Sequence, residues 1–114
     1  MALNTCSFAG NLVADSTLHE LGEDNGVLNF RIAVNNKKPV KKGRKTVYED
    51  DPLFLNCSIF GKRALSLEEY LLKGVKVAVT GELRANDWED KEGNQRHDVQ
   101  LTVFNVEFMS SKDR

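Results

Sequence analysis

The chain has 114 residues and a formal net charge of −1 at pH 7, with 40% hydrophobic and 29% charged residues. This length suits one compact domain, and this composition is ordinary for a folded soluble protein. No apolar run approaches the roughly 18–20 residues needed to span a bilayer, and the N-terminus lacks the basic-then-apolar pattern of a signal peptide, so we expect a cytoplasmic protein without membrane contact.

The first third of the chain predicts strands with one apolar and one polar face. Residues 3–13 are expected to form a strand with Cys6, Phe8 and Leu12 inward, and residues 17–21 extend it after a short break. Residues 27–35 alternate regularly, which is typical of a half-buried strand. Their inward side chains are expected to be Leu28, Phe30, Ile32 and Val34, while Arg31 and Asn35 point outward.

A run of six cations without an acid follows between residues 37 and 45. These cations are Lys37, Lys38, Lys41, Lys42, Arg44 and Lys45. Since the whole chain has a net charge of −1, the rest of it carries −7. Many charge runs are merely solvated, but one this local can attract a polyanion. Pro39 and Gly43 are expected to prevent regular pairing in this basic arm.

Residues 53–60 predict a strand with aromatic residues on its polar face. Leu55, Cys57 and Ile59 alternate as core residues, which leaves Phe54 and Phe60 outward beside Asn56 and Ser58, with Lys62 just beyond. Flat rings beside cations suit single-stranded nucleic acid, because bases stack on the rings while lysines hold the phosphates. The alternative is that another part of the fold covers this face.

The last half predicts one helix, over residues 62–73, and two further strands. Gly74 is expected to end the helix, because glycine tolerates the left-handed backbone of a helix C-terminus. Strands are expected over residues 75–83 and 97–108, with a hairpin tip at 90–94. The apolar phase of the last strand switches by one residue at Val103–Phe104, which predicts a bulge.

This order gives five strands, with one α-helix between the third and the fourth. It fits an all-β fold, a five-stranded Greek-key barrel of the OB type, although an α+β sandwich would produce a similar pattern. The first 110 residues are expected to form this domain and residues 111–114 a short C-terminal end.

Cys6 and Cys57 are expected to be free thiols. No cysteines or histidines stand at zinc-type spacing, so neither a metal nor a cofactor is predicted.

The outward residues converge on one candidate surface. Arg31 and Asn56 share it with the two phenylalanines, and the same alternation brings Arg84 and Trp88 to it. Trp88 stands among polar residues, so it is expected to stack on a base or to pack against a partner subunit. Base-edge reading needs convergent polar side chains at fixed geometry, which the sequence does not reveal, so little sequence preference is expected.

Enzymatic readings have little support in the sequence. It contains no P-loop, no glycine-rich dinucleotide turn and no His-x-Glu motif with paired cysteines. The protein is therefore not expected to be an enzyme. A nuclease that gathers scattered carboxylates around magnesium is the enzymatic alternative.

Six blocks occur in an order that resembles the bacterial-type single-stranded-DNA-binding protein family. They are AGNL (9–12) followed by Asp15, FRIAVN (30–35), FLNCSIFGK (54–62), YLLKG (70–74), VTGEL (79–83) and WEDKEGN (88–94). The resemblance implies an OB fold, a homotetramer that pairs through residues 3–13, and sequence-tolerant wrapping of single strands in replication, recombination or repair. It also implies that Phe54, Phe60 and Trp88 stack on bases and that four basic residues line the strand path. These four are Lys62, Lys73, Arg84 and Arg96.

Three departures from the family pattern affect these expectations. Phe54 stands where the family commonly has tryptophan. Lys37, Lys38 and Pro39 stand where many members carry another aromatic residue, for which Tyr48 is a candidate substitute. Family members usually end in a flexible linker and an acidic tip that recruits partner proteins, whereas this chain ends at Ser110–Arg114. Tail-mediated partners are therefore not expected, whether the chain is a trimmed domain or a tailless version.

The expected function is sequence-tolerant binding and protection of single-stranded DNA, with RNA as a weaker ligand. The alternative is an OB-fold primosomal or accessory protein that mainly docks other replication proteins.

Overall fold

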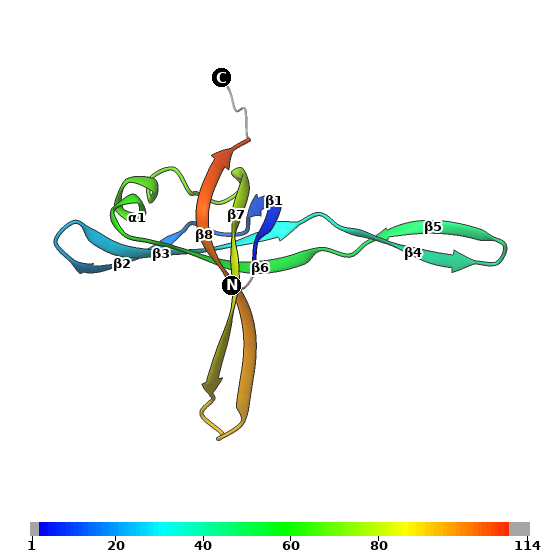
Figure 1. Cartoon of the computed structure of the whole chain (residues 1–114). Helices are drawn as coiled ribbons and strands as arrows, with labels where there is room; N and C mark the ends of the chain where they lie inside the picture. The colour runs from blue at the N-terminus through cyan, green and yellow to red at the C-terminus, as the bar shows by residue number, and fades with distance from the viewer. Residues whose placement is uncertain (1–2, 110–114) are drawn as a thin grey trace.

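The computed structural model describes residues 3–109, which form eight β-strands and one short α-helix (Figure 1). In chain order these are β1 (Cys6–Leu12), β2 (Thr17–Gly22), β3 (Asn25–Val34), β4 (Lys37–Lys42), β5 (Lys45–Asp50), β6 (Leu53–Phe60), α1 (Lys62–Leu67), β7 (Lys76–Glu89) and β8 (Gln95–Phe108). The described residues contain no helix that is long and apolar enough to cross a membrane.

Five of the strands are connected in a ring, as the OB prediction requires. The sheet order is β1-β7-β8-β6-β3-β2, and β1 also pairs with β3. Two links of the ring are short: β1 joins β3 through Asn11–Ala33 and Leu12–Ile32, and β6 joins β8 through three parallel pairs. The ring is therefore a partly open barrel, with α1 between its third and fourth strands in chain order.

The core lies inside this ring and consists mainly of the strand residues with the inward alternation, with Ala64 of α1 and Leu71 added to them. Within residues 3–109, thirteen hydrophobic residues are buried, namely Leu12, Leu28, Phe30, Ile32, Leu55, Cys57, Ile59, Ala64, Leu71, Val77, Val79, Leu101 and Val103. The predicted free thiols are confirmed for both cysteines. Burial raises the pKa of the Cys57 thiol to about 12, so this side chain is a neutral core group.

The predicted helix over residues 62–73 is too long. Helix α1 ends at Leu67, and the chain then passes through turns, although Leu71 remains fully buried. The apolar spacing of this segment therefore predicted burial correctly but not helical conformation. Gly74 does have a positive φ of 90°, but it lies in the turn that leads to β7 rather than at the end of the helix.

The predicted bulge at Val103–Phe104 is confirmed. Thr80 of β7 pairs with Asn105 of β8, whereas the next residue, Gly81, pairs with Val103, so Phe104 has no partner across the ladder. A methyl group at Gly81 would overlap the backbone carbonyl oxygen of Thr102. Glycine is therefore required where the bulged strands come close together.

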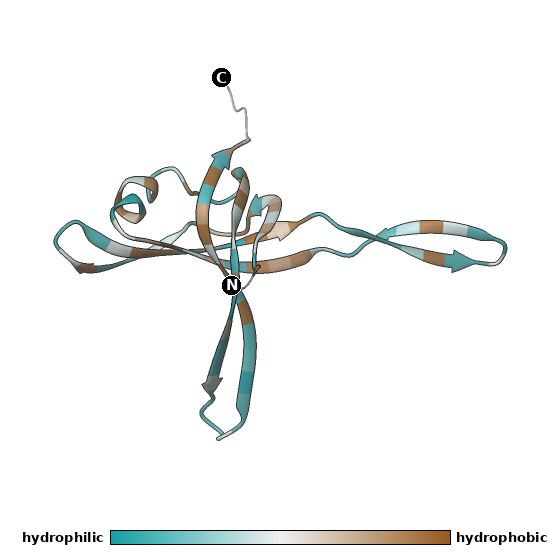
Figure 2. Cartoon of the chain, in the orientation of Figure 1, coloured by the Kyte–Doolittle hydropathy of each residue, from teal (hydrophilic) through white to brown (hydrophobic). Residues whose placement is uncertain are grey.

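Two long arms project from the barrel in different directions (Figure 1). One is the β4–β5 hairpin and the other is the outer half of the β7–β8 hairpin, in which β7 continues to Glu89 instead of ending at residue 83 and β8 begins two residues earlier than predicted. The expectation that Pro39 and Gly43 prevent pairing is wrong. Pro39 pairs with Tyr48 in a strand that has only one neighbour, so its missing N–H is tolerated, and Gly43 adopts a φ of 65° in the turn. Figure 2 shows hydrophobic residues along the barrel strands and mainly hydrophilic residues along both arms.

Candidate nucleic-acid interface

The outer face of β6 carries two exposed aromatic rings. Phe54 is 49% exposed and Phe60 is 52% exposed, whereas Leu55 and Ile59 between them are buried. The two rings lie on one face of the strand because successive side chains alternate. Both rings therefore keep about half of their surface in solvent and are available for stacking, as the sequence predicted.

Arg31 adds a cation to this face. It lies beside Asn56 in the β3–β6 ladder, and its guanidinium carbon is 5.1 Å from the centre of the Phe54 ring. Such a contact orients the ring through a cation–π interaction. A base could then stack on the open side of Phe54 while Arg31 supplies a positive charge for a nearby phosphate.

The ladder between β3 and β6 continues into the β4–β5 arm without a change of register. Val34 pairs with Leu53 and Lys37 pairs with Asp50, so two residues separate the ladders on each side. The Asp51 N–H donates to the Asn36 carbonyl oxygen at 2.8 Å, which links the two strands across this gap.

Tyr48 therefore follows the same alternation as the phenylalanines of β6. It is 68% exposed and lies opposite Pro39, one of the positions where the family resemblance implies an aromatic residue. Tyr48, Phe54 and Phe60 stand at intervals of six residues, which corresponds to roughly 20 Å between successive rings along a strand. The three rings form a stripe that follows the twist of the ribbon.

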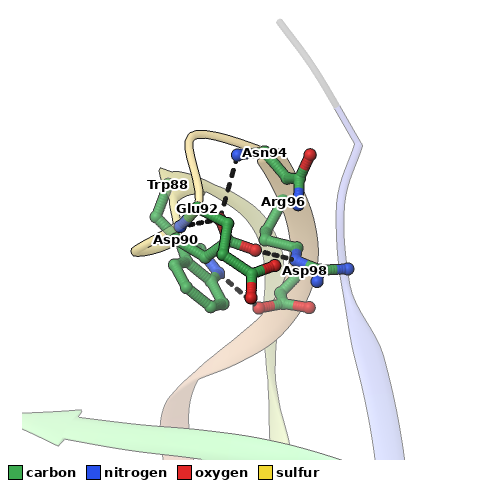
Figure 3. A network of polar contacts seen from close by, with 6 residues as sticks. All are labelled: Trp88, Asp90, Glu92, Asn94, Arg96 and Asp98. Atoms are coloured by element: carbon green, nitrogen blue, oxygen red, sulfur yellow. Dashed lines mark hydrogen bonds and ion pairs between the residues drawn. The ribbon is translucent and has the colours of Figure 1, made fainter.

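Trp88 lies on the second arm and is held by a cross-strand hydrogen bond. Its ring is 45% exposed, and its Nε1–H donates to Asp98 Oδ2 at 2.7 Å (Figure 3). Arg96, its partner in the ladder, donates from Nε to Asp90 Oδ2 at 2.9 Å. The indole N–H is thus occupied within the chain, which leaves the faces of the ring for stacking on a base or for packing against a partner subunit.

Asp90 closes the tip of this arm. One of its carboxylate oxygens accepts hydrogen bonds from the backbone N–H groups of Glu92 and Asn94 at 3.0 and 2.9 Å (Figure 3). The hydrogen bond from Asn94 is the main cause that lowers the pKa of Asp90 below its ordinary value, and the bond from Arg96 adds to it. The carboxylate therefore stays charged and holds the tip rigid.

Several predicted phosphate-binding residues already have acidic partners. Lys37 lies 2.6 Å from Asp50, and Lys42 lies 3.9 Å from Glu49. Ion pairs also join Arg84 to Glu82 and Arg96 to Asp90. Glu49 and Asp50 lie beside these cations because β5 runs back along the lysines of β4. The cation of each pair is exposed, and such pairs contribute little energy each, so a phosphate can replace the carboxylates.

The remaining predicted cations are not ion-paired within residues 3–109. They are Arg31, Lys38, Lys41, Arg44, Lys45, Lys62 and Lys73. Four of them are on the β4–β5 arm, whose residues 37–50 hold six cations and two carboxylates. The other arm has the opposite charge, since residues 86–98 hold five carboxylates and two arginines or lysines. The β4–β5 arm is therefore the stronger attractor for phosphates.

Ser58 of β6 is buried, which differs from the expectation that it is exposed to solvent. Only 4% of its surface is exposed, and its Oγ–H donates a hydrogen bond to Asn29 Oδ1 at 2.7 Å. Together with Asn56 it borders a hollow of about 350 Å³ on the aromatic face. Sequence gave no signal for this hollow, because its walls come from four strands and from the turn after β1.

The charge of the β4–β5 arm leads to a prediction about salt. Replacing Lys38, Lys41 and Lys45 by glutamine should reduce the magnitude of the slope of log K against log salt concentration by up to about 2, because each phosphate contact on a single strand contributes roughly −0.7. Titrations with an oligothymidine at several salt concentrations measure this slope. Lys91→Gln, on the acidic arm, is the single-site control, and an unchanged slope in the triple variant would show that the basic arm is only solvated.

Comparison with known proteins agrees with this geometry. The sequence model of the single-strand binding protein family matches residues 3–109. A single-stranded DNA-binding protein of Borreliella burgdorferi is 37% identical over 110 residues, which cover 96% of this chain and 71% of that protein. The protein of the same name from Staphylococcus epidermidis is 31% identical, with 98% of this chain and 80% of that protein covered. Among solved structures, the SSB of Plasmodium falciparum in complex with ssDNA superposes with a TM-score of 0.81 over 96% of this chain and 97% of that chain, at 16% identity.

Proposed function

Because the chain belongs to the single-strand binding protein family, we propose that it binds and protects single-stranded DNA in replication, recombination or repair. The observation that carries this proposal is the pair of half-exposed rings, Phe54 and Phe60, on the outer face of β6 with Arg31 against one of them. Half-exposed rings beside a cation provide flat surfaces on which a ligand can stack. Every base has a flat face, so stacking on these rings tolerates any sequence.

The proposed mechanism combines stacking with phosphate attraction and needs no chemical step. The β4–β5 arm attracts the strand through its lysines, and the bases then stack along Tyr48, Phe54 and Phe60. Trp88 supplies a further ring from the second arm. Lys62 and Lys73, without ion pairs in the described part of the chain, and Arg84 and Arg96, after release from their carboxylates, contact phosphates along the path. RNA is a second ligand in this proposal, because neither stacking on the rings nor contacts to phosphates exclude a 2′-hydroxyl.

We also propose that the protein is a homo-oligomer, a tetramer as is typical of the family, and that subunits pair through β1. Along its length β1 pairs with β7, but it reaches β3 only through Asn11 and Leu12. The edge of β1 before these two residues has no strand partner within residues 3–109, and Ser7 and Ala9 are exposed beside it. An unpaired strand edge can pair with a second chain.

The cytoplasm of a bacterial or phage-infected cell is the compartment in which this proposed function places the protein. Residues 111–114, expected as a short C-terminal end, lie outside the described residues, so recruitment of partners through the end of the chain forms no part of the proposal. The accessory-protein alternative predicts weak DNA binding together with a strong protein partner.

Trp88 fluorescence provides the direct test of DNA binding. Addition of an oligothymidine should quench the emission, because a base stacks on the indole, whereas a duplex of the same length should have little effect. Trp88→Ala should weaken binding of the oligothymidine by about 1–3 kcal/mol and leave the thermal unfolding temperature nearly unchanged. Equal quenching by duplex, or an unchanged affinity in the variant, would instead assign Trp88 to a subunit interface.

A further inference from the structure

The hollow on the aromatic face is lined by polar side chains from separate strands. It has a volume of about 350 Å³ and lies beside Phe54, because Arg31 and Asn56 form part of its wall. Asp15 lines it from the turn after β1, and Gln100 from β8. A hollow of this size is large enough for a small planar ligand.

The strand register brings the side chains of this wall into one row. Arg31 of β3 pairs with Asn56 of β6, Asn56 pairs with Gln100 of β8, and Gln100 pairs with Arg84 of β7. Paired residues point to the same side of a sheet. Within residues 3–109 the side-chain amides of Asn56 and Gln100 have no hydrogen-bond partner, although each amide can both donate and accept. These two amides can therefore form hydrogen bonds with the polar edge of a planar ligand.

Two other groups in the wall have a fixed polarity. Asn29 accepts the Ser58 hydroxyl hydrogen bond at Oδ1, so its NH₂ group is left as a donor. Asp15 accepts the Lys73 backbone N–H at Oδ1, over 2.8 Å, and its second carboxylate oxygen is an acceptor only. The hollow thus offers a fixed donor and a fixed acceptor, with the adaptable amides of Asn56 and Gln100 beside them.

We propose that this hollow binds the edge of one nucleobase and favours a base that presents an amino group next to a ring-nitrogen acceptor, cytosine or adenine, over thymine. Cytosine presents an amino donor next to a ring-nitrogen acceptor, which matches the carboxylate of Asp15 and the NH₂ group of Asn29. Thymine presents the reverse order, a carbonyl acceptor next to an N–H donor, so its carbonyl oxygen would face the carboxylate. This inference rests on the proposed function: the strand binds with any sequence through stacking, and a single position adds a preference.

The test compares oligodeoxycytidine with oligothymidine of equal length at neutral pH. The two oligomers carry the same number of phosphates and rings of the same size, so the ratio of their affinities reports the base edge. One good pair of base-edge hydrogen bonds discriminates by about fivefold or more, and we expect the wild-type protein to bind oligodeoxycytidine more tightly by this factor.

Two variants change the hydrogen-bonding groups that line the hollow and keep side chains of similar size there. Asp15→Asn keeps an acceptor oxygen for the Lys73 backbone N–H but replaces the second carboxylate oxygen by an NH₂ group, which donates hydrogen bonds. Asn56→Leu with Gln100→Met replaces both amides by apolar groups of similar size. Either variant should bring the affinity ratio close to one, while Asn105→Leu, an exposed site on β8 outside the hollow, should leave it unchanged.

Each outcome decides the inference. A ratio above about five that disappears in both variants and persists in Asn105→Leu supports it. A wild-type ratio near one or in favour of thymine, with tight binding of both oligomers, overturns the base-edge site but leaves the proposed function intact. A cytosine preference that survives in either variant also overturns the site. Failure to bind either oligomer overturns the inference and the proposed function together.

Discussion

Replacing both Phe54 and Phe60 by alanine should weaken binding to an oligothymidine by about 2–6 kcal/mol, since each stacked base contributes roughly 1–3 kcal/mol. The two losses should be nearly additive, because the rings stand roughly 20 Å apart along the strand. Both side chains are about half exposed, at 49% and 52%, so their removal should leave the fold intact. Fluorescence titration of the double variant and of each single variant measures the loss and its additivity.

Phe104 provides a matched control for this experiment. It is 53% exposed, nearly the same as Phe60, but it lies at the bulge of β8 rather than on β6. Phe104→Ala should therefore remove the same surface area from the protein with little effect on affinity. A comparable loss in the control would mean that general surface hydrophobicity, not stacking on the β6 face, drives binding.

The second large effect is expected on stability, at Leu101 in the middle of β8. This side chain is fully buried, and Leu101 pairs with Cys57 of β6 on one side and with Leu83 of β7 on the other. Leu101→Ala should lower the free energy of unfolding by about 2–5 kcal/mol, because the protein loses the hydrophobic stabilisation of the removed side-chain atoms and is left with a cavity in their place. The melting temperature should fall by roughly 10 °C or more, which thermal unfolding followed by circular dichroism measures.

Leu21 on β2 offers the same substitution in an exposed environment. It is 59% exposed, so Leu21→Ala should change the free energy of unfolding by only about 0.5 kcal/mol or less. A small effect at Leu101 would show that the core tolerates a cavity at this position of β8.

The sequence by itself predicted most of the core and the two exposed rings of β6. Alternation assigns Leu28, Ile32 and Ile59 to the core and the two phenylalanines of β6 to the surface, and the structure agrees at each position. It also located the bulge at Phe104, because a bulge shifts the apolar phase by one residue. These features follow from local geometry, because successive side chains of a strand point to opposite faces of the sheet.

Only the tertiary structure decided what lies across from each strand. The β4–β5 hairpin places Glu49 and Asp50 beside lysines that looked unpaired in sequence, and β7–β8 places Asp98 against Trp88. The polar row through Asn56 and Gln100 joins residues 44 positions apart in the chain, so no local pattern could reveal it. Composition and alternation report burial, but the pairing of strands sets electrostatic partners and hydrogen-bond geometry, because these interactions act across the sheet and not along it.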